Sequence, residues 1–346
     1  MKACHGGTIL PVSTLTPQRR SARLPDRDRP APTLAAYGLR MLGVLLIMSA
    51  IAMSLSRAPD RPVETLVARW GLPPSTFLDL GGQLVHLRDV GPRGDPQPIV
   101  LLHGTSDSLH TWEPWVQGLQ AQRRVVTLDL PGFGLTGPRA DGDYRGDADA
   151  RFVLRVLDAL QLQRVVLGGN SLGGEVAWRL ATLAPERVDR LILVDASGLP
   201  GEGQAVPLGW RIAQAPGLGW LLEAMLPRAL VVQALVEVYA DPDKITDALV
   251  DRYYELTLRE GNRHALIERL RQYHRAADAG RVATIRQPTL ILWGAQDRLI
   301  PPATAREFQR RIAGSTLRLF DGVGHVPQEE DPARTLAAVK AFLAIE

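Results

Sequence analysis

The sequence contains a single cysteine, Cys4, in 346 residues. One cysteine can form neither an intramolecular disulfide nor a cysteine metal cluster, so other side chains must carry any chemistry. Lysine is also scarce, because only three of the 40 basic residues are lysine. We attribute this to a coding bias and infer no function from it.

Most of the chain lacks an excess of positive charge. Residues 1–61 contain nine Lys or Arg against three Asp, a net charge of +6, and the whole chain carries +3, which leaves −3 for the remainder. Nucleic-acid-binding domains usually carry a basic excess, so the sequence gives no support for nucleic acid as a partner. Its 45% hydrophobic content indicates instead a chain that can bury a large core.

The N-terminal region divides into a polar and an apolar part. Residues 1–33 are rich in Arg, Pro, Ser and Thr, and we expect a disordered leader. Residues 34–56 contain only one charge, Arg40, and their length predicts a transmembrane anchor. A cleaved signal peptide, with Ala50-Ile51-Ala52 resembling a small-x-small cleavage site, and a buried core helix are the alternatives.

Basic residues on the two sides of this segment predict its orientation. Arginines are more numerous before its uninterrupted part than after it: Arg19, Arg20, Arg23, Arg27, Arg29 and Arg40 against Arg57, Arg61 and Arg69. Positively charged flanks tend to stay in the cytoplasm. We therefore expect a single-pass membrane protein with a cytoplasmic N-terminus and a globular domain outside, in the periplasm or another extracytoplasmic space.

The remaining chain alternates between short apolar runs and helical or loop stretches. Residues 57–74 read as a linker with an amphipathic piece over 63–70. Eight strand candidates follow, at 77–80, 84–90, 99–102, 125–128, 165–167, 191–194, 289–293 and 317–320. This alternation predicts an α/β fold with a doubly wound, mostly parallel eight-stranded sheet, built from residues 75–197 and 287–346.

Residues 198–286 interrupt the alternation between strands and helices. They contain helical candidates separated by prolines and no good strand. We expect a helical cap over the carboxyl ends of the strands, where open α/β sheets bind ligands. Four apolar side chains of this cap could line an acyl pocket or serve as ordinary packing groups: Trp210, Trp220, Met225 and Tyr239.

Residues 168–174, with the sequence GGNSLGG, lie between a strand candidate and a helix candidate. In this context Gly-x-Ser-x-Gly predicts a sharp turn that exposes Ser171, with the helix N-terminus directed at a developing oxyanion. A serine hydroxyl is a poor nucleophile, so Ser171 requires a base and an acid elsewhere in the chain. A glycine-rich turn with a bystander serine is the alternative.

Asp297 and His325 each follow a later strand candidate, in GAQD and GVGH. We expect His325 to take the proton from Ser171, and Asp297 to fix the imidazole tautomer and stabilise its cation. Asp195 also follows a strand and is the alternative acid. Because it stands where the chain enters the cap, we expect it instead to cap or hinge that segment.

The loop His103-Gly104-Thr105-Ser106 follows the strand candidate at 99–102. A loop in this place can direct a backbone N–H group opposite the one that follows Ser171. The backbone N–H groups of Thr105 and Leu172 are therefore the expected oxyanion hole. We expect His103 to hold the loop in place.

The ordered set of motifs resembles that of the α/β-hydrolases. The resemblance covers about residues 77–346 and rests on His103-Gly104, Asp129-Leu130-Pro131-Gly132-Phe133-Gly134, Gly169-Asn170-Ser171-Leu172-Gly173, Asp297 and Gly324-His325. It implies a Ser-His-Asp triad that works without metal or cofactor, and a loop organised by Asp129. Some members of this superfamily place the acid at the earlier position, that of Asp195. Within the superfamily the chain is similar to capped bacterial esterases and lipases, and to meta-cleavage carbon–carbon hydrolases, which also place Asn before the serine.

These observations predict a serine hydrolase that cleaves small carboxylic esters with apolar groups through an acyl-enzyme. A carbon–carbon hydrolase is the alternative, although Val326 stands where those enzymes usually have tryptophan. A cofactor-free haloperoxidase or perhydrolase shares the triad, whereas epoxide hydrolases and haloalkane dehalogenases carry Asp in place of Ser171. A membrane-tethered binding protein without catalysis is the alternative from another class, because fold alone does not ensure activity.

Overall fold

The computed structural model describes residues 33–345 except for 201–209, 212–214, 216, 218 and 274–277. The leader expected at 1–33 lies, apart from Thr33, outside the described residues. The chain divides into two compact units, residues 1–52 and 53–346.

The described part of the first unit is helical. Helix α1 (Leu34–Leu55) has 22 residues, and at 1.5 Å per residue it covers about 33 Å, slightly more than the hydrocarbon core of a bilayer. None of its most apolar stretch is buried. The expected N-terminal helix is therefore confirmed, and by length and composition it can cross a membrane.

The second unit is built on one eight-stranded sheet with the strand order β1-β2-β4-β3-β5-β6-β7-β8. The strands are β1 (Ser75–Asp79), β2 (Leu84–Val90), β3 (Ile99–Leu102), β4 (Val125–Leu128), β5 (Val165–Asn170), β6 (Val188–Val194), β7 (Thr289–Gly294) and β8 (Thr316–Phe320). The pairs β1·β2 and β2·β4 are antiparallel, and the other five pairs are parallel. The predicted mostly parallel α/β sheet is confirmed.

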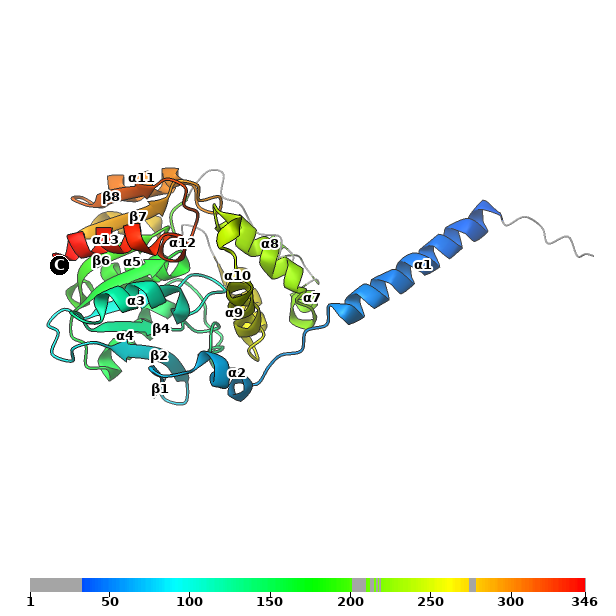
Figure 1. The fold of residues 1–346 in the computed structure, drawn as a ribbon, viewed down its shortest axis with the longest axis horizontal. Helices are drawn as coiled ribbons and strands as arrows, with labels where there is room; N and C mark the ends of the chain where they lie inside the picture. The colour runs from blue at the N-terminus through cyan, green and yellow to red at the C-terminus, as the bar shows by residue number, and fades with distance from the viewer. Residues whose placement is uncertain are drawn as a thin grey trace, which may run out of the picture. The chain divides into compact units, whose positions relative to one another are not determined.

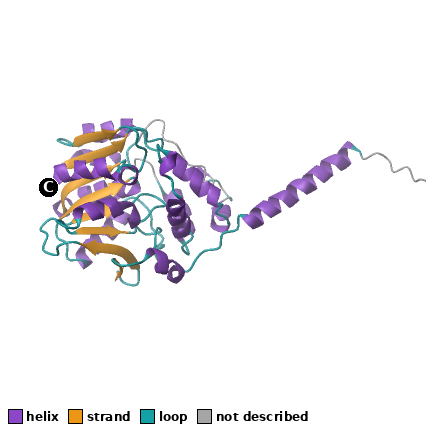
Figure 2. Cartoon of the chain, in the orientation of Figure 1, coloured by secondary structure: helices purple, strands orange, loops and turns teal. Residues whose placement is uncertain are grey.

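Helices cover both faces of this sheet (Figure 2). They are α3 (Glu113–Leu119), α4 (Ala148–Ala159), α5 (Leu172–Leu183), α11 (Pro302–Arg311), α12 (Pro327–Glu330) and α13 (Pro332–Leu343). Side chains of β3 alternate between the faces: Val100 and Leu102 pack in a cluster with α4, α5 and α11, and Ile99 and Leu101 pack in a cluster with α3 and α13. Continuous apolar strands are expected where helices cover both faces of a parallel sheet.

The described part of the segment between β6 and β7 consists of helices joined by loops. It contains α7 (Gly219–Ala224), α8 (Arg228–Val238), η4 (Pro242–Lys244), α9 (Asp247–Thr257), α10 (Asn262–Gln272) and η5 (Ala279–Thr284). Helices α8, α9 and α10 lie together at one end of the strands (Figure 1). We call this helical insertion the cap.

Residues 57–74, expected to be a linker, pack against the cap. The amphipathic piece forms α2 (Val63–Trp70), and its Leu66 is buried against Leu135 and Leu256. The chain before α2 is also bound, since Ala58 N–H donates to the Ala224 carbonyl at 3.1 Å. We call residues 56–70 the strap, and it belongs to the second unit.

Candidate active site

Ser171 occupies the turn between β5 and α5. Its backbone has φ 52° and ψ −115°, a region that non-glycine residues rarely adopt. Three backbone hydrogen bonds hold it there: Ser171 N–H donates to Val194 O at 2.9 Å, and Ser171 O accepts from the N–H groups of Glu175 and Ser197, both at 3.0 Å. The elbow expected from the motif is therefore present, and backbone strain of this kind is typical of functional sites.

Two glycines of the motif are required by close packing. A Cβ atom at Gly169 would lie 2.2 Å from the carbonyl group of Gly173, and a Cβ atom at Gly173 would lie 2.2 Å from the Leu102 carbonyl oxygen. Both contacts are with backbone atoms, which cannot move aside as a flexible side chain can. Only glycine lets α5 start this close to β3 and β5.

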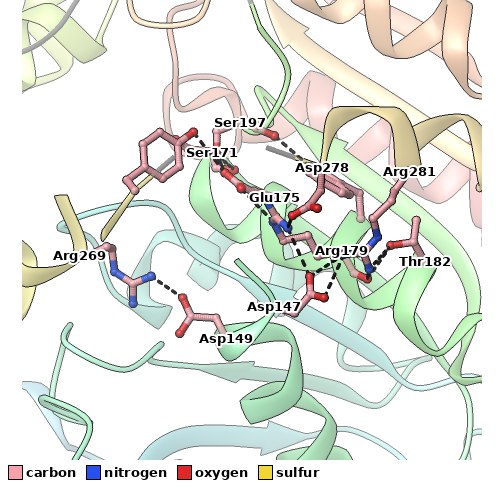
Figure 3. A network of polar contacts seen from close by, with 12 residues as sticks. Asp147, Asp149, Ser171, Glu175, Arg179, Thr182, Ser197, Arg269, Asp278 and Arg281 are labelled. Carbon is pink, nitrogen blue, oxygen red and sulfur yellow. Dashed lines mark hydrogen bonds and ion pairs between the residues drawn. The ribbon is translucent and has the colours of Figure 1, made fainter. Parts of the chain in front are cut away.

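A polar network lies behind the elbow (Figure 3). The Ser197 hydroxyl, 3.2 Å from Ser171 O, also donates to Glu175 at 2.9 Å. Glu175 in turn binds Arg179 at 2.9 Å, and Arg179 binds Asp278 at 2.7 Å. Glu175 and Arg179 are both buried, and each has a partner of opposite charge inside the protein. Through Ser197, this network supports the backbone of the turn at Ser171.

Asp297 and His325 form a buried pair. The Asp297 Oδ2 atom lies 2.7 Å from His325 Nδ1, and Asp297 Oδ1 accepts the N–H groups of Leu299 and Ile300 at 2.8 Å and 3.0 Å. The two backbone donors fix the carboxylate, so its second oxygen is directed at the imidazole. The structure thus brings together the two residues that the sequence placed after separate strands.

The serine elbow is fastened to the histidine loop. Asn170, directly before Ser171, donates from Nδ2 to the His325 carbonyl at 3.0 Å and to the Val194 carbonyl at 3.2 Å. Among the described residues, no hydrogen bond joins the Ser171 hydroxyl to the His325 ring. Such contacts are often long in enzymes without substrate and shorten when substrate binds.

The loop after β3 passes close to Ser171. A Cβ atom at Gly104 would lie 3.2 Å from Ser171 Cβ. His103 is buried and neutral, because burial lowers its pKa, and its Nε2 accepts the Leu130 N–H at 2.9 Å. Within the described chain, the Thr105 N–H has no hydrogen-bond partner. His103 therefore holds the loop, and the Thr105 N–H is available to a ligand.

Asp129 organises the loop after β4. It is buried and accepts hydrogen bonds from the N–H groups of Leu109 and Leu135, both at 2.7 Å, and lies 2.6 Å from His86 Nδ1. Burial would raise the pKa of this carboxyl group, but the charge and hydrogen bond of His86 hold it below its ordinary value. The role implied by the resemblance fits these contacts.

Asp195 directly follows β6, as expected, and its side chain is bound to the end of β7. It is fully buried, and its Oδ1 accepts the Gly294 N–H at 3.0 Å. One side-chain atom from each of Asp195, Asp297 and His325 lies within 4.8 Å of the other two. Because β6 and β7 are neighbours, the residue directly after β6 lies beside the loop that carries Asp297. In the sequence, the pair could have been noticed only as two aspartates that each follow a strand candidate.

The same three side chains could in principle hold a metal ion. A tetrahedral zinc ion lies about 2.1 Å from each ligand, which separates two ligand atoms by more than about 3 Å. Asp297 and His325 are instead 2.7 Å apart, a hydrogen-bond distance. The geometry fits a shared proton better than a metal ion.

The four side chains expected to line an acyl pocket lie in different surroundings. Trp220 is 53% exposed on the short helix α7, so it does not line an interior pocket. Trp210 packs on Ile267 and Leu270, and Met225 pairs with the strap. Tyr239 is buried and donates its hydroxyl to Glu329 at 2.5 Å. The surroundings of these four side chains depend on solvent exposure and on contacts between distant segments. The spacing of apolar residues in the sequence predicts neither of these.

A cavity lies between the loops after β3 and β4 and helices α9 and α10. Its lining combines the apolar side chains of Phe133, Leu256 and Leu266 with polar ones that include Ser106. Ser106 directly follows Thr105, so the cavity adjoins the expected oxyanion loop. Nothing in the sequence distinguished Leu256 and Leu266 from ordinary core residues.

A buried ion cluster adjoins this cavity. Asp107, which also lines it, lies 3.6 Å from Arg252, and Arg252 binds Glu329 on its other side. Burial and the nearby charge of Glu329 raise the pKa of Asp107 to about 7. Arg252 is therefore matched by carboxyl groups on two sides.

Comparison with protein families gives a match over most of the second unit. The family model described as alpha/beta hydrolase fold matches residues 97–332. The chain is 30% identical over 257 residues to the 2-hydroxymuconate semialdehyde hydrolase of Pseudomonas sp. strain CF600, covering 71% of this chain and 87% of that protein.

Two further proteins are similar over a comparable range. The 2-hydroxy-6-oxo-2,4-heptadienoate hydrolase of Pseudomonas putida strain F1 is 31% identical over 276 residues, which covers 77% of this chain and 95% of that protein. A solved meta-cleavage product hydrolase from Pseudomonas fluorescens IP01 superposes with a TM-score of 0.68 at 24% identity, covering 78% of this chain and 97% of that chain.

Proposed function

The chain belongs to the alpha/beta hydrolase fold family, and from this premise we propose that it is a serine hydrolase of carboxylic esters with apolar groups. The observation that carries the proposal is the buried 2.7 Å contact between Asp297 and His325, together with the strained elbow at Ser171. A nucleophile, a base and an orienting acid are the three groups that acyl transfer requires.

In the proposed mechanism, Ser171 Oγ attacks the ester carbonyl carbon while its proton passes to Nε2 of His325. Asp297 holds the proton on Nδ1 of the ring, so that Nε2 presents a lone pair, and it stabilises the imidazolium that forms. The imidazolium then protonates the leaving alkoxide. Water attacks the acyl-enzyme with His325 again as base, which releases the acid and restores Ser171.

The negative charge that develops on the carbonyl oxygen must be stabilised by hydrogen-bond donors that are already in position before the reaction. We assign this role to the backbone N–H groups of Thr105 and Leu172. The N–H of Thr105 is unpaired within the described chain, and Leu172 is the first residue of α5, where the helix dipole adds positive potential. Loss of one such donor typically costs about 100- to 1,000-fold in kcat.

The surroundings of the cavity favour an uncharged substrate. Phe133, Leu256 and Leu266 contribute apolar surface to the cavity, and the buried cation beside it, Arg252, already has Asp107 and Glu329 as partners. A carboxylate substrate would have to displace one of these partners, at the expense of leaving a buried charge unpaired. This contact pattern supports esters with apolar acyl or alcohol groups.

A carbon–carbon hydrolase is the second candidate, because the names of two relatives that are about 30% identical describe hydrolases of this kind. The same Ser171, His325 and Asp297 would serve it. The substrate named for the Pseudomonas putida relative is a dienoate, an anion, and this chain would need a free cation near the cavity to bind it. The two candidates therefore differ in the charge of the substrate.

A fluorophosphonate probe tests the proposed nucleophile. Wild-type protein should be labelled at Ser171, Ser171→Ala should not be labelled, and the control Ser315→Ala should be labelled like wild type. Ser171→Ala should also lower ester turnover by on the order of 10⁶. Folded wild-type protein that resists the probe would contradict the proposal.

A substrate panel separates the two candidates. Esters of increasing acyl length and a meta-cleavage dienoate should be compared by kcat/KM on the same preparation. We expect the longer neutral esters to be preferred. A higher kcat/KM for the dienoate would select the carbon–carbon hydrolase instead.

We also propose that α1 anchors the protein in a membrane, with a cytoplasmic N-terminus and the hydrolase unit on the opposite side. The length of α1, its exposed apolar surface and the arginines before it support this. Full-length protein should remain in the membrane pellet after alkaline carbonate washing. A variant that starts at Ser56 and keeps the strap should be soluble and active, and aggregation of that variant would indicate that α1 belongs to the core.

A further inference from the structure

Asp195 and Asp297 are two buried carboxyl groups that share one site. Asp195 directly follows β6 and is held in a left-handed backbone conformation, with φ 43°. Its N–H donates to the Leu292 carbonyl at 3.1 Å, and its Oδ1 accepts the Gly294 N–H at 3.0 Å. Both bonds attach it to β7, so its side chain is fixed next to the loop that carries Asp297.

The hydrogen-bond partners of the two groups differ. Every partner of Asp297 among the described residues is a donor: the N–H groups of Leu299 and Ile300, and His325 Nδ1. Asp195 has a single donor, on Oδ1, while its Oδ2 is buried with no donor in reach. These environments favour an anion at Asp297 and a neutral acid at Asp195, because a buried anion requires several donors or a cation.

The charges around Asp195 agree with this distribution of protons. The side chains that raise its pKa are Asp297 and, more weakly, Glu330 after β8, and a ring nitrogen of His325 also lies within 4.8 Å of its carboxyl group. Burial first, and then the neighbouring carboxyl group of Asp297, raise the pKa of Asp195 well above its ordinary value. Two neighbouring buried carboxyl groups are costly to ionise together, which favours a proton on one of them.

We propose that Asp195 is a protonated positioning residue, which donates a hydrogen bond from Oδ2 to the carboxylate of Asp297 and so fixes the acid that orients His325. This rests on the proposed triad. Oδ2 of Asp195, which otherwise has no hydrogen-bond partner among the described residues, would then donate to Asp297. The carboxylate of Asp297 would gain a further hydrogen-bond donor on the side away from His325. Asp195 itself touches neither Ser171 nor substrate.

Asp195→Asn tests the charge of the group. The amide has the same shape, can accept from Gly294 and can donate to Asp297, so kcat should stay within a few-fold of wild type and the acid limb of the pH profile of kcat/KM should not move. If Asp195 were ionised, the substitution would remove a charge near His325. The acid limb would then move down by about 1 to 3 pH units, and that result would overturn the proposal.

Asp195→Ala tests the hydrogen bond. It removes the donor to Asp297, and we expect kcat to fall by roughly 10- to 100-fold with a smaller change in KM. The matched control is Asp189→Ala, which removes an aspartate of β6, the strand that Asp195 follows, at a site paired with Arg164. If Asp195→Ala keeps the kcat of the wild type, the hydrogen bond from Asp195 does not position Asp297, and the proposal is overturned.

The proton can also be observed without turnover. In the Ser171→Ala protein at pH 9, where Asp107 has lost its proton, infrared difference spectra should contain a C=O stretching band of a protonated carboxyl group. Adding Asp195→Asn should remove that band, and adding Asp189→Ala should not. A spectrum that lacks the band overturns the proposal. If the band is present but the wild-type protein hydrolyses no ester, the proposed function is refuted and the proton remains assigned to Asp195.

Discussion

Replacing Asp297 by Asn changes one atom of the site. Oδ1 of Asp297 accepts the N–H groups of Leu299 and Ile300, so the oxygen of the new amide has to stay in that position. The NH₂ group then takes the place of Oδ2 and faces His325 Nδ1, 2.7 Å away in the native protein. A donor now points at the ring nitrogen that carried the proton.

The ring responds by changing its tautomer. With an amide donor in front of it, Nδ1 becomes the acceptor and Nε2 carries the proton, so Nε2 can no longer accept the proton of Ser171. We expect kcat to fall by about 10⁴, the loss that an incorrect tautomer causes in another serine hydrolase triad. This factor corresponds to about 5.5 kcal/mol of transition-state stabilisation.

The assay is steady-state hydrolysis of the preferred ester by purified variants, with thermal unfolding measured in parallel. Asn at 297 keeps the two backbone hydrogen bonds, so the melting temperature should change little. Asp321→Asn, an exposed aspartate that follows β8, is the control and should have wild-type kcat. A fall of less than 10-fold for Asp297→Asn, or a larger fall for Asp195→Asn, would refute this account of the acid.

Three further perturbations act on other parts of the structure. Gly173→Ala places a Cβ atom 2.2 Å from the Leu102 carbonyl oxygen, and it should lower the free energy of unfolding by about 3 kcal/mol or more, measured by urea denaturation. Leu66→Ala opens the contact between strap and cap and should cost about 2–4 kcal/mol in the same assay. His110 donates to the Trp70 carbonyl, and burial lowers its pKa to about 3. Its folded pKa is below the unfolded value of about 6.5, so its stabilising effect is complete above that pH and is lost as the pH falls toward 3. His110→Gln should therefore reduce the acid sensitivity of the melting temperature between pH 6 and pH 4, and unchanged sensitivity would contradict this role.

Much of the fold follows from local sequence patterns. Short apolar runs predicted the strands, because a parallel sheet covered on both faces requires them, and the glycines around Ser171 predicted the elbow because only glycine fits there. Asp297 and His325 were found because each follows a strand and the carboxyl ends of parallel strands meet at one edge.

The features that were not predicted depend on neighbours distant in the sequence. The pairing of Asp195 with Asp297 follows from the adjacency of β6 and β7, which strand candidates alone do not order. The strap packs because Leu66 meets Leu256 of the cap, and an eight-residue amphipathic stretch does not show what its apolar face will contact. Trp220 was expected to line a pocket because of its residue type. It lies on the short helix α7 and is exposed to solvent, which its residue type does not reveal.

The strap determines how much freedom a membrane-bound form of this protein retains. Only Ser56 separates the end of α1 from Arg57, which is bridged to Met225 of the cap. A single residue spans at most about 3.5 Å, so under the proposed anchoring the connecting chain is short. The catalytic unit would search for substrate in two dimensions, in a thin layer next to the bilayer. Its turnover there would follow the local concentration of substrate in that layer more closely than the bulk concentration, as for any tethered reactant.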